Sequence, residues 1–194
     1  MRALEDNFIC FTTPLPPSVN DYLGYKVLWR NKKAVVFPYK KEKALKFNKL
    51  VKDKLSKLVK ETGWEEADEY TYVVCKVKVY LEKKRQDSDN LFKVLLDSIN
   101  SVEGLLYDDS MIIPYVEDVK IDSKNPRLEV ELYLADKIGV FNRDQHSEFI
   151  KKNCSNCTRF KRNCGLLKDS VHNKVKEEIS IETLSCTARK VKKT

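Results

Sequence analysis

Two stretches of the chain alternate between apolar and polar side chains with a period of two, which is typical of half-buried β-strands. The alternating apolar residues are Val73, Cys75, Val77 and Val79 in the first stretch and Leu128, Val130, Leu132 and Leu134 in the second. A turn at residues 123–126 predicts that the second strand pairs with one around residues 116–121. Near the amino terminus, the segment from Phe8 to Thr12 predicts a short strand that is stopped by Pro14.

Two other stretches repeat apolar residues at intervals of three and four, which places those residues on one face of a helix. The first runs from about Lys41 to Thr62, and Gly63 follows at a position where a left-handed residue commonly ends a helix. The second ends before Gly104 and has the apolar residues Leu91, Val94, Leu95, Leu96 and Ile99. A small hairpin is predicted from residues 27–29 and 34–37. The order of these elements predicts an α/β (α+β) fold in which a mixed β-sheet is flanked by two main helices.

Charge is distributed unevenly along the chain. Residues 138–194 carry 13 lysines and arginines against six aspartates and glutamates, so nearly all of the net charge of +8 lies there. We therefore expect one domain over residues 1–137 and a small, basic, cysteine-containing tail over residues 138–194. Such a tail is suited to binding a polyanion, most commonly nucleic acid, although lysines can also serve only to keep a segment in solution.

The composition is that of a soluble globular protein, with 42% hydrophobic and 34% charged residues. No window is apolar enough to span a membrane, and the amino terminus shows no secretory signal, so we expect a cytoplasmic location. In that reducing compartment the six cysteines are not expected to form disulfides. Cys10 and Cys75 lie in apolar, strand-like segments, which predicts that both are inert core residues.

The densest group of reactive side chains lies around the second predicted helix. Its members are Asp87 and Asp89 at the start of the helix, Lys93 and Asp97 at successive intervals of four, and Asp108 and Asp109 after a glycine turn. Residues four apart share one face of a helix, and the segment after the turn must lie near the helix that it has just left. The sequence therefore predicts that several carboxylates and one ammonium group come together.

Carboxylates placed this densely repel one another unless they bind a hard cation or one of them becomes protonated. Magnesium-dependent cleavage of a phosphodiester needs two or three carboxylate ligands and open positions for phosphate and water. Lys93 would then stabilise the negative charge of the transition state or position the attacking water. In the simpler interpretation, Asp89 or its neighbour only caps the helix, and Asp97 is structural.

At these residues the chain resembles the RusA-type Holliday junction resolvases. The matching segments are Asp87-Ser88-Asp89-Asn90-Leu91-Phe92-Lys93, Asp97-Ser98-Ile99-Asn100 and Gly104-Leu105-Leu106-Tyr107-Asp108-Asp109-Ser110. The amino-terminal segment Pro14-Leu15-Pro16-Pro17-Ser18-Val19-Asn20 is similar to the proline-rich segment with which that family begins. The resemblance covers about residues 7–134, and the two matches together are more specific than either motif alone.

The resemblance implies that Asp87, Asp89 and Asp109 are catalytic acids and ligands of Mg²⁺, with Lys93 as the essential cation. It also implies a homodimer that binds four-way DNA junctions and makes paired, symmetric nicks in recombination and repair. The acidic pair lies one residue farther from Asp89 than the family pattern has it, which leaves open whether Asp108 or Asp109 is the ligand.

Two further residues depart from the family pattern. Met111 stands where the family often has glutamine. Pro114 lacks a backbone donor and is expected to interrupt the strand that follows the acidic pair.

Four cysteines in the basic tail form a second candidate site. Cys154, Cys157, Cys164 and Cys186 could supply the four thiolates of a structural zinc site, although the gaps of six and 21 residues are irregular. An iron–sulfur cluster and four reduced, free thiols are the alternatives. His146 or His172 could each replace one cysteine.

Two basic segments are candidate DNA contacts. Lys83, Lys84 and Arg85 directly precede the acidic cluster, and Lys161 and Arg162 lie between cysteines of the tail. Both sets could neutralise backbone phosphates.

Taken together, the residues favour a magnesium-dependent, structure-selective endodeoxyribonuclease that acts on branched DNA. The principal alternative is a non-catalytic protein that binds DNA junctions, in which the acids serve only as helix caps. A zinc-dependent DNA-binding or regulatory protein is a third hypothesis.

Overall fold

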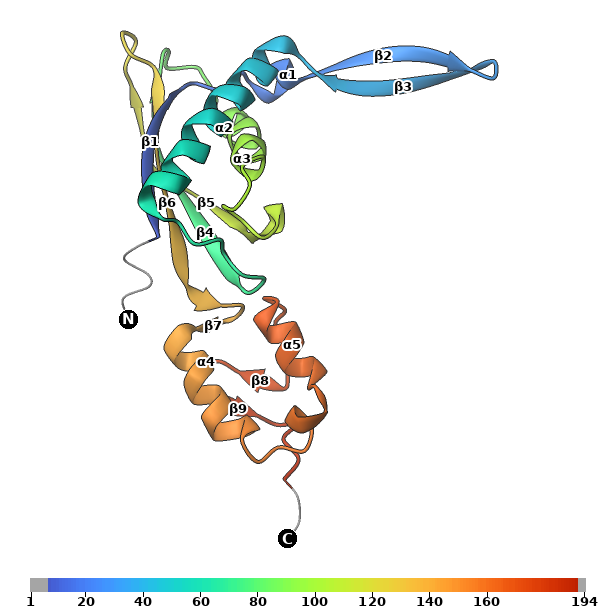
Figure 1. The fold of residues 1–194 in the computed structure, drawn as a ribbon, viewed down its shortest axis with the longest axis vertical. Helices are drawn as coiled ribbons and strands as arrows, with labels where there is room; N and C mark the ends of the chain where they lie inside the picture. Colours follow the sequence, from blue (N-terminus) through green and yellow to red (C-terminus); the bar gives the residue numbers. More distant parts are fainter. Residues whose placement is uncertain (1–6, 192–194) are drawn as a thin grey trace. The chain divides into compact units, whose positions relative to one another are not determined.

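The computed structural model describes residues 7–191, which divide into two compact units. Unit 1 comprises residues 7–67 and 73–134, and unit 2 comprises residues 68–72 and 135–191. The main elements of unit 1 are β1 (Phe8–Pro14), α1 (Val19–Tyr22), β2 (Leu23–Arg30), β3 (Lys33–Lys40), α2 (Glu42–Thr62), β4 (Thr71–Leu81), α3 (Asp89–Asn100), the short 3₁₀ helix η1 (Asp109–Met111), β5 (Ile112–Ile121) and β6 (Arg127–Ile138) (Figure 1). The sheet is mixed and two main helices accompany it, which confirms the predicted fold class.

The main sheet has the strand order β1-β6-β4-β5. Strand β1 runs antiparallel to β6, whereas β5 runs parallel to β4 with a bulge between Val77 and Lys78. The prediction that residues 116–121 pair with residues 128–134 is wrong, because β4 lies between those two strands. The turn between them remains, but it passes over the end of β4, where the backbone N–H of Asp122 donates to the carbonyl of Leu81.

Strand β5 forms one edge of the sheet, and this explains two departures from the sequence expectations. Pro114 does not interrupt the strand but lies within it, opposite Cys75 of β4. A proline is tolerated on an edge strand because its missing donor can face away from the ladder. Strand β1 likewise continues to Pro14 at the other edge of the main strand order.

The main sheet buries one face and exposes the other. Every second residue of β4 is buried, beginning with Thr71 and ending with Leu81, and the intervening residues are partly exposed. Helices α2 and α3 lie against the buried face (Figure 1). Cys75 is buried there as predicted, but Cys10 points to the other side and is exposed, so its assignment to the core is wrong.

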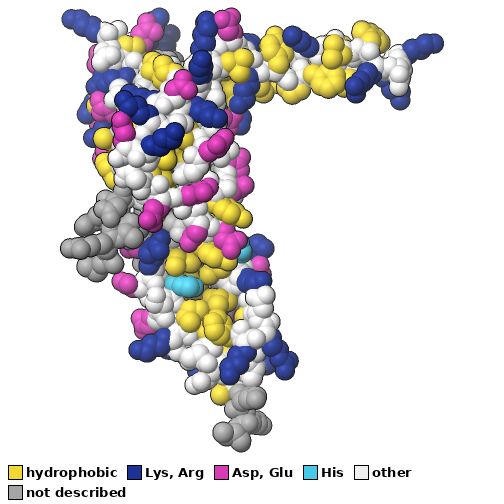
Figure 2. Space-filling view, viewed as in Figure 1, with side chains coloured by type: hydrophobic (Ala, Val, Ile, Leu, Met, Phe, Trp, Pro, Cys, Tyr) yellow, Lys and Arg dark blue, Asp and Glu magenta, His cyan; other side chains and the backbone are white. Residues whose placement is uncertain are grey.

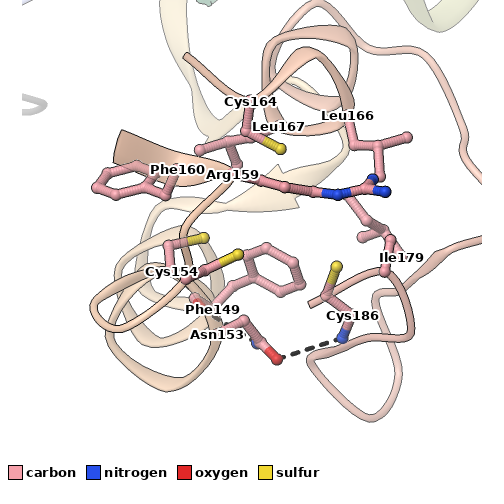
Figure 3. A pocket seen from close by; sticks show the side chains of 12 residues that line it. Phe149, Asn153, Cys154, Arg159, Phe160, Cys164, Leu166, Leu167, Ile179 and Cys186 are labelled. Carbon is pink, nitrogen blue, oxygen red and sulfur yellow. Dashed lines mark hydrogen bonds between the residues drawn. The ribbon is translucent and has the colours of Figure 1, made fainter. Parts of the chain in front are cut away.

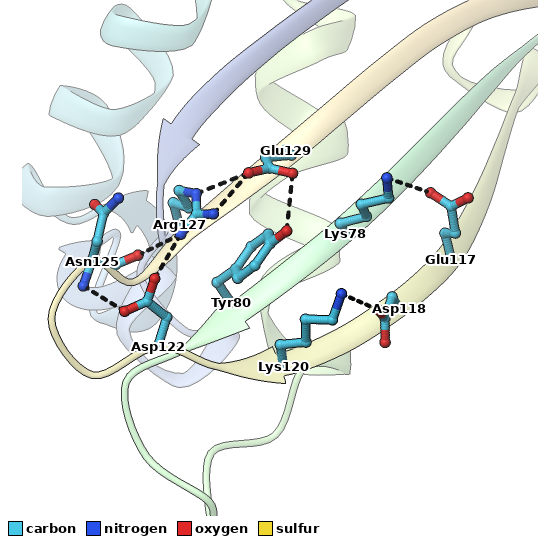
Figure 4. Close-up of polar contacts among 9 residues, drawn as sticks. All are labelled: Lys78, Tyr80, Glu117, Asp118, Lys120, Asp122, Asn125, Arg127 and Glu129. Carbon is cyan, nitrogen blue, oxygen red and sulfur yellow. Dashed lines mark hydrogen bonds and ion pairs between the residues drawn. The ribbon is translucent and has the colours of Figure 1, made fainter.

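The outer face of the sheet carries paired charges (Figure 4). Lys76 Nζ lies 2.9 Å from a carboxylate oxygen of Glu117 and 3.2 Å from one of Glu131. The Arg127 guanidinium bridges Asp122 at 2.9 Å and Glu129 at 2.8 Å, and it lies 3.6 Å from the centre of the Tyr80 ring. Neighbouring strands are therefore also linked on their solvent side.

Helix α3 presents its apolar side chains to the core and its charged ones to solvent. Leu91, Val94, Leu95 and Ile99 are buried, whereas Asp89 and Lys93 are exposed. Helix α2 packs against α3 and contributes the buried residues Ala44, Phe47, Val51 and Leu55. It ends at Gly63, whose φ of 67° is the left-handed conformation that the sequence predicted there.

A long hairpin projects from unit 1. Strands β2 and β3 pair antiparallel along their whole lengths, and the turn between them places Asn31 and Lys32 at positive φ. Nearly all of its residues are exposed. Figure 2 shows hydrophobic and basic side chains side by side along this arm. The predicted hairpin is confirmed, although it is about twice as long as expected.

Unit 2 has its own small core. Its elements are β7 (Phe141–Asn142), α4 (Arg143–Phe149), the π-helical turn η2 (Ile150–Cys154), the 3₁₀ turn η3 (Phe160–Arg162), α5 (Gly165–Val171), β8 (Ile179–Ser180) and β9 (Ser185–Cys186). The buried cluster consists of Phe141, Phe149, Cys154 and Ile179. Helix α4 begins with a reciprocal cap, in which the Asn142 N–H donates to the Gln145 side chain at 2.9 Å. Within residues 7–191, no helix has the length and apolar character needed to cross a bilayer.

We expect Leu95→Ala to destabilise unit 1 by about 2–5 kcal/mol, because it leaves a cavity beneath α3. Leu95 is fully buried, whereas Leu45 on α2 is 54% exposed. Leu45→Ala is therefore the matched control and should change the free energy of unfolding by no more than about 0.5 kcal/mol. Urea unfolding followed by circular dichroism measures both values. Equal effects of the two substitutions would show that α3 does not pack as described.

We also expect unit 1 to lose stability in acid. The pKa of Glu117 is lowered chiefly by Lys76, and that of Asp122 is lowered chiefly by the backbone N–H of Asn125 and then by Arg127. Their stabilising contribution is complete above the ordinary values of 4.5 and 3.8, and it is lost as the pH falls through the lower, folded-state values. Melting temperatures between about pH 7 and about pH 3 test this.

The variant Arg127→Met should have a lower melting temperature near neutral pH and should lose less on acidification, because Asp122 loses its ion pair with Arg127 and keeps only the N–H groups of its own turn. Lys83→Met, at an exposed site, is the control. The interpretation is wrong if the native chain melts at the same temperature across the whole range.

Candidate active site

The amino-terminal end of α3 carries two of the predicted acids. Asp87 lies just before the helix and Asp89 is its first residue, and both are exposed. The Asp89 carboxylate accepts the backbone N–H of Asn90 at 2.9 Å, and the Asn90 side chain donates to Asp87 at 3.5 Å. Asn90 therefore links the two carboxylates. The residue in the cap position is Ser88, and its side chain makes no capping bond, so these acids are not explained as ordinary helix caps.

One turn further along α3, Lys93 is held by a chain of polar contacts. Its ammonium group lies 3.5 Å from the Asp97 carboxylate, whose other oxygen accepts a hydrogen bond of 2.6 Å from the Tyr22 hydroxyl. Burial and the bond to Asp97 raise the pKa of Tyr22 to about 12, so Tyr22 stays protonated and remains a donor. Asp97 thus fixes Lys93 and ties α3 to α1, which agrees with a structural role for Asp97.

The structure distinguishes the two acids of the glycine-turn segment. Asp108 precedes η1, and its carboxylate accepts the backbone N–H of Ser110 at 3.0 Å and also the Ser110 hydroxyl. These bonds lower the pKa of Asp108. Asp109 is the first residue of η1 and is exposed. Asp108 is therefore engaged in shaping the turn, while Asp109 lines a hollow beside α3.

This hollow has a volume of about 350 Å³ and lies between α3 and the segment that leads into β5. Its lining residues are Lys93, Leu96, Asp97, Asn100, Asp109 and Ile112. The carboxylates of Asp97 and Asp109 and the ammonium group of Lys93 thus line one hollow. They come from two segments of the chain that the sequence predicted to lie close together. Asp87 and Asp89 do not line this hollow but lie at the start of the same helix.

The carboxylates have the right chemistry for a hard cation, since magnesium prefers oxygen ligands. Asp87, Asp89 and Asp109 form no ion pair with any of residues 7–191, so their oxygens are not already engaged by lysine or arginine there. Across the same residues, however, no three His, Cys, Asp or Glu side chains stand close enough together to hold a metal ion as they are placed. A shared ion would require Asp109 and the acids at the start of α3 to approach each other.

Tyr22 was not identified from the sequence. It lies just after the proline-rich segment, and its apolar ring is buried while its hydroxyl reaches Asp97. Its position two residues after the proline-rich segment is the only feature of the sequence that could have indicated Tyr22. Lys83, Lys84 and Arg85 are exposed in the connection between β4 and α3, next to the acids, and Lys83 lies 3.7 Å from the carboxylate of Glu82.

The four cysteines of unit 2 line a single small cavity (Figure 3). Cys154 and Cys157 are buried, Cys164 and Cys186 are partly exposed, and all four are free thiols. Burial, followed by the proximity of the other three thiols, raises the pKa of Cys154 to about 11. Burial also raises the pKa of Cys157, but backbone N–H groups of Lys190, Phe160 and Arg159 outweigh it, so the net shift is downward.

Neither histidine lines this cavity. His146 packs on the Phe141 ring at 5.8 Å between centroids, and burial lowers its pKa. His172 packs on the Tyr70 ring at 5.5 Å. Both are engaged with aromatic side chains rather than with the thiols, so the cysteines alone form the second candidate site.

Comparison with known proteins identifies the family to which the larger site belongs. No curated protein matches the chain. The model of the endodeoxyribonuclease RusA family matches residues 26–133, which include all the acids described above and most of the hairpin and of β6. Because this match covers more than half of the chain, the protein belongs to the RusA family of Holliday junction-resolving endodeoxyribonucleases.

Proposed function

We propose that this nuclease is magnesium-dependent and resolves four-way DNA junctions, in recombination and repair, by paired nicks made as a homodimer. The observation that carries the proposal is the hollow beside α3, where Asp109 of η1 meets Lys93 and Asp97 of α3. The same helix begins next to the exposed carboxylates of Asp87 and Asp89. Family membership supports branched DNA as the substrate. The carboxylate oxygens support magnesium as the metal. A cytoplasmic location remains a prediction.

Asp87, Asp89 and Asp109 would hold the metal, and Asp109 is the better candidate of the acidic pair because Asp108 is bound to Ser110. Magnesium, when bound, would supply Lewis acidity for the phosphate and its attacking water. Lys93 would donate to a non-bridging phosphate oxygen and so stabilise the charge that develops in the transition state. Asp97, itself held by Tyr22, would keep the ammonium group directed toward that oxygen.

A homodimer would explain symmetric cleavage, because two active sites related by a twofold axis can face equivalent strands of one junction. Sedimentation analysis of the full chain, alone and with a synthetic junction, tests this assembly. A chain that cuts the junction as a monomer would contradict the paired mechanism.

Asp89→Asn and Lys93→Ala should each reduce cleavage of a synthetic four-way junction by about 100-fold or more, because each removes an interaction with the reacting phosphate. Cleavage by the native chain should require added magnesium and should cease with a chelator. Asp53→Asn and Lys124→Ala make the same chemical changes at exposed positions that do not line the hollow, and they should retain full activity.

The outcomes of this assay separate the hypotheses. Full activity in either site variant would remove the proposed mechanism. Tight junction binding without cleavage by the native chain in magnesium would favour the non-catalytic alternative. Cleavage of linear duplex as fast as of the junction would contradict structure selectivity.

The hairpin formed by β2 and β3 would supply a DNA-binding surface for this activity. Residues 23–40 contain five lysines and arginines and no acidic residue. Trp29 is 75% exposed and Tyr25 is 67% exposed, so aromatic rings lie among those cations. Pairing of two such hairpins between copies would bring like charges together, whereas a polyanion would neutralise them. We therefore assign the hairpin to DNA rather than to the contact between protomers.

Removing four cations from the hairpin, with K26A/R30A/K32A/K33A, should weaken junction binding by about tenfold or more and should flatten its salt dependence. Binding measured without magnesium keeps this test separate from cleavage. The control removes the same charge from the solvent face of α2, with K49A/K52A/K57A/K60A. Equal losses in the two variants would mean that net charge alone matters and would contradict a specific role of the hairpin.

A further inference from the structure

The cavity in unit 2 is formed by four thiols that reach it from separate segments. Cys154 ends the π-helical turn η2, Cys157 lies in the following turn, Cys164 directly precedes α5, and Cys186 lies on β9. The remaining lining is largely apolar, with side chains such as Phe149, Leu166 and Ile179, and the cavity volume is about 20 Å³. Cys154 and Cys186 are distant in the sequence, so they meet at this cavity only because the tertiary fold brings η2 and β9 together.

Hydrogen bonds fix the backbone around these thiols. Asn153 donates to the carbonyl of Leu184 at 2.9 Å and accepts the backbone N–H of Cys186 at 3.2 Å, which joins η2 to β9. The backbone N–H of Lys190 donates to Cys157 Sγ at 3.5 Å. Backbone N–H groups that point at a cysteine sulfur stabilise its thiolate, which is the form that binds metals.

The apolar core of unit 2 is small. Its buried cluster has four members, and one of them is Cys154 itself. Small units of this kind usually need disulfides or a bound metal to remain folded. All four cysteines of this unit are free, so disulfides do not serve that purpose here.

We propose that Cys154, Cys157, Cys164 and Cys186 form a tetrathiolate metal centre around which unit 2 folds. Each thiol would lose its proton to solvent as its sulfur binds the metal. The centre could be a zinc ion or an iron–sulfur cluster, because both are bound by four cysteine thiolates.

The placement of the four thiols bears on how a zinc ion or an iron–sulfur cluster would fit. Within residues 7–191, no three ligating side chains stand at the distances that a single ion requires, although these four surround one cavity. Either occupant would therefore require the thiols to move. A zinc ion would require them to turn inward, and a four-iron cluster would require a cavity larger than about 20 Å³. Figure 3 shows the sulfurs of Cys154, Cys164 and Cys186 distributed around the cavity rather than gathered at one point.

Such a centre would also fix a basic segment. The chain between Cys157 and Cys164 contains η3, on which Lys161 and Arg162 are exposed. Binding of both flanking thiols to one centre would hold this short loop in place. The DNA contacts predicted for Lys161 and Arg162 would then depend on the metal.

The test is the metal content of the full chain, purified without oxygen from cells supplied with both zinc and iron. We expect about one zinc ion per chain, or about four iron atoms with acid-labile sulfide and visible absorption. Cys164→Ser and Cys186→Ser should lose the metal. Cys10→Ser, at an exposed cysteine of unit 1, is the matched control and should keep it.

A second measurement covers the case in which a cysteine variant fails to fold. In the native, metal-loaded chain, alkylation should modify Cys10 but none of the four cluster cysteines, and a strong chelator should expose those four and lower the melting temperature. The proposal is overturned if the chain holds neither metal after anaerobic reconstitution, or if chelation changes neither reactivity nor melting.

This proposal does not depend on the nuclease mechanism. Asp89→Asn lies in unit 1, far in sequence from the cysteines, and should abolish cleavage while leaving the metal content unchanged. Loss of metal with full cleavage activity, in Cys164→Ser, would show that the two sites act independently.

Discussion

The burial of one face of α3 is the constraint on which the active site depends. Leu91, Val94, Leu95 and Ile99 are held between α2 and the sheet, so the opposite face must project into solvent. The spacing of four that joins Asp89, Lys93 and Asp97 keeps all three on that exposed side. A hydrophobic interaction therefore sets the direction in which these charged groups project.

Local periodicity explains why the strands and helices could be predicted, and its limits explain the errors. The alternation in β4 and the helical spacing in α2 and α3 are determined by which face is buried, so both are visible in the sequence. The neighbour of a strand is not determined locally. The turn at residues 123–126 indicated that β5 and β6 are joined, but it could not indicate that β4 lies between them. Cys10 was misplaced for a related reason, since an apolar edge strand does not itself show which of its faces meets the core.

The active site could be predicted as a set of residues but not as a geometry. The motif indicated Asp87, Asp89, Lys93 and the acidic pair because the family resemblance fixes their order along the chain. It did not show that Tyr22 anchors Asp97, because that contact depends on how α1 meets α3. The contact of Asp108 with Ser110 is local, between residues two apart, but the family motif does not indicate which acid of the pair makes it. The structure thus adds a set of positioning contacts, from Tyr22 through Asp97 to Lys93, that holds the lysine in place.

The two units differ in how much apolar surface they bury. Unit 1 buries a large, continuous set of apolar side chains and can therefore keep its carboxylates exposed at the surface. Unit 2 buries few apolar residues, and one of these is a thiol close to three others. A thiol that packs as a small hydrophobe would suffice at one position, as Cys75 does in the sheet. Four thiols around one cavity, with a backbone donor directed at Cys157, are better explained by a ligand than by packing, because packing alone gives no reason for four sulfurs from separate segments to line the same space.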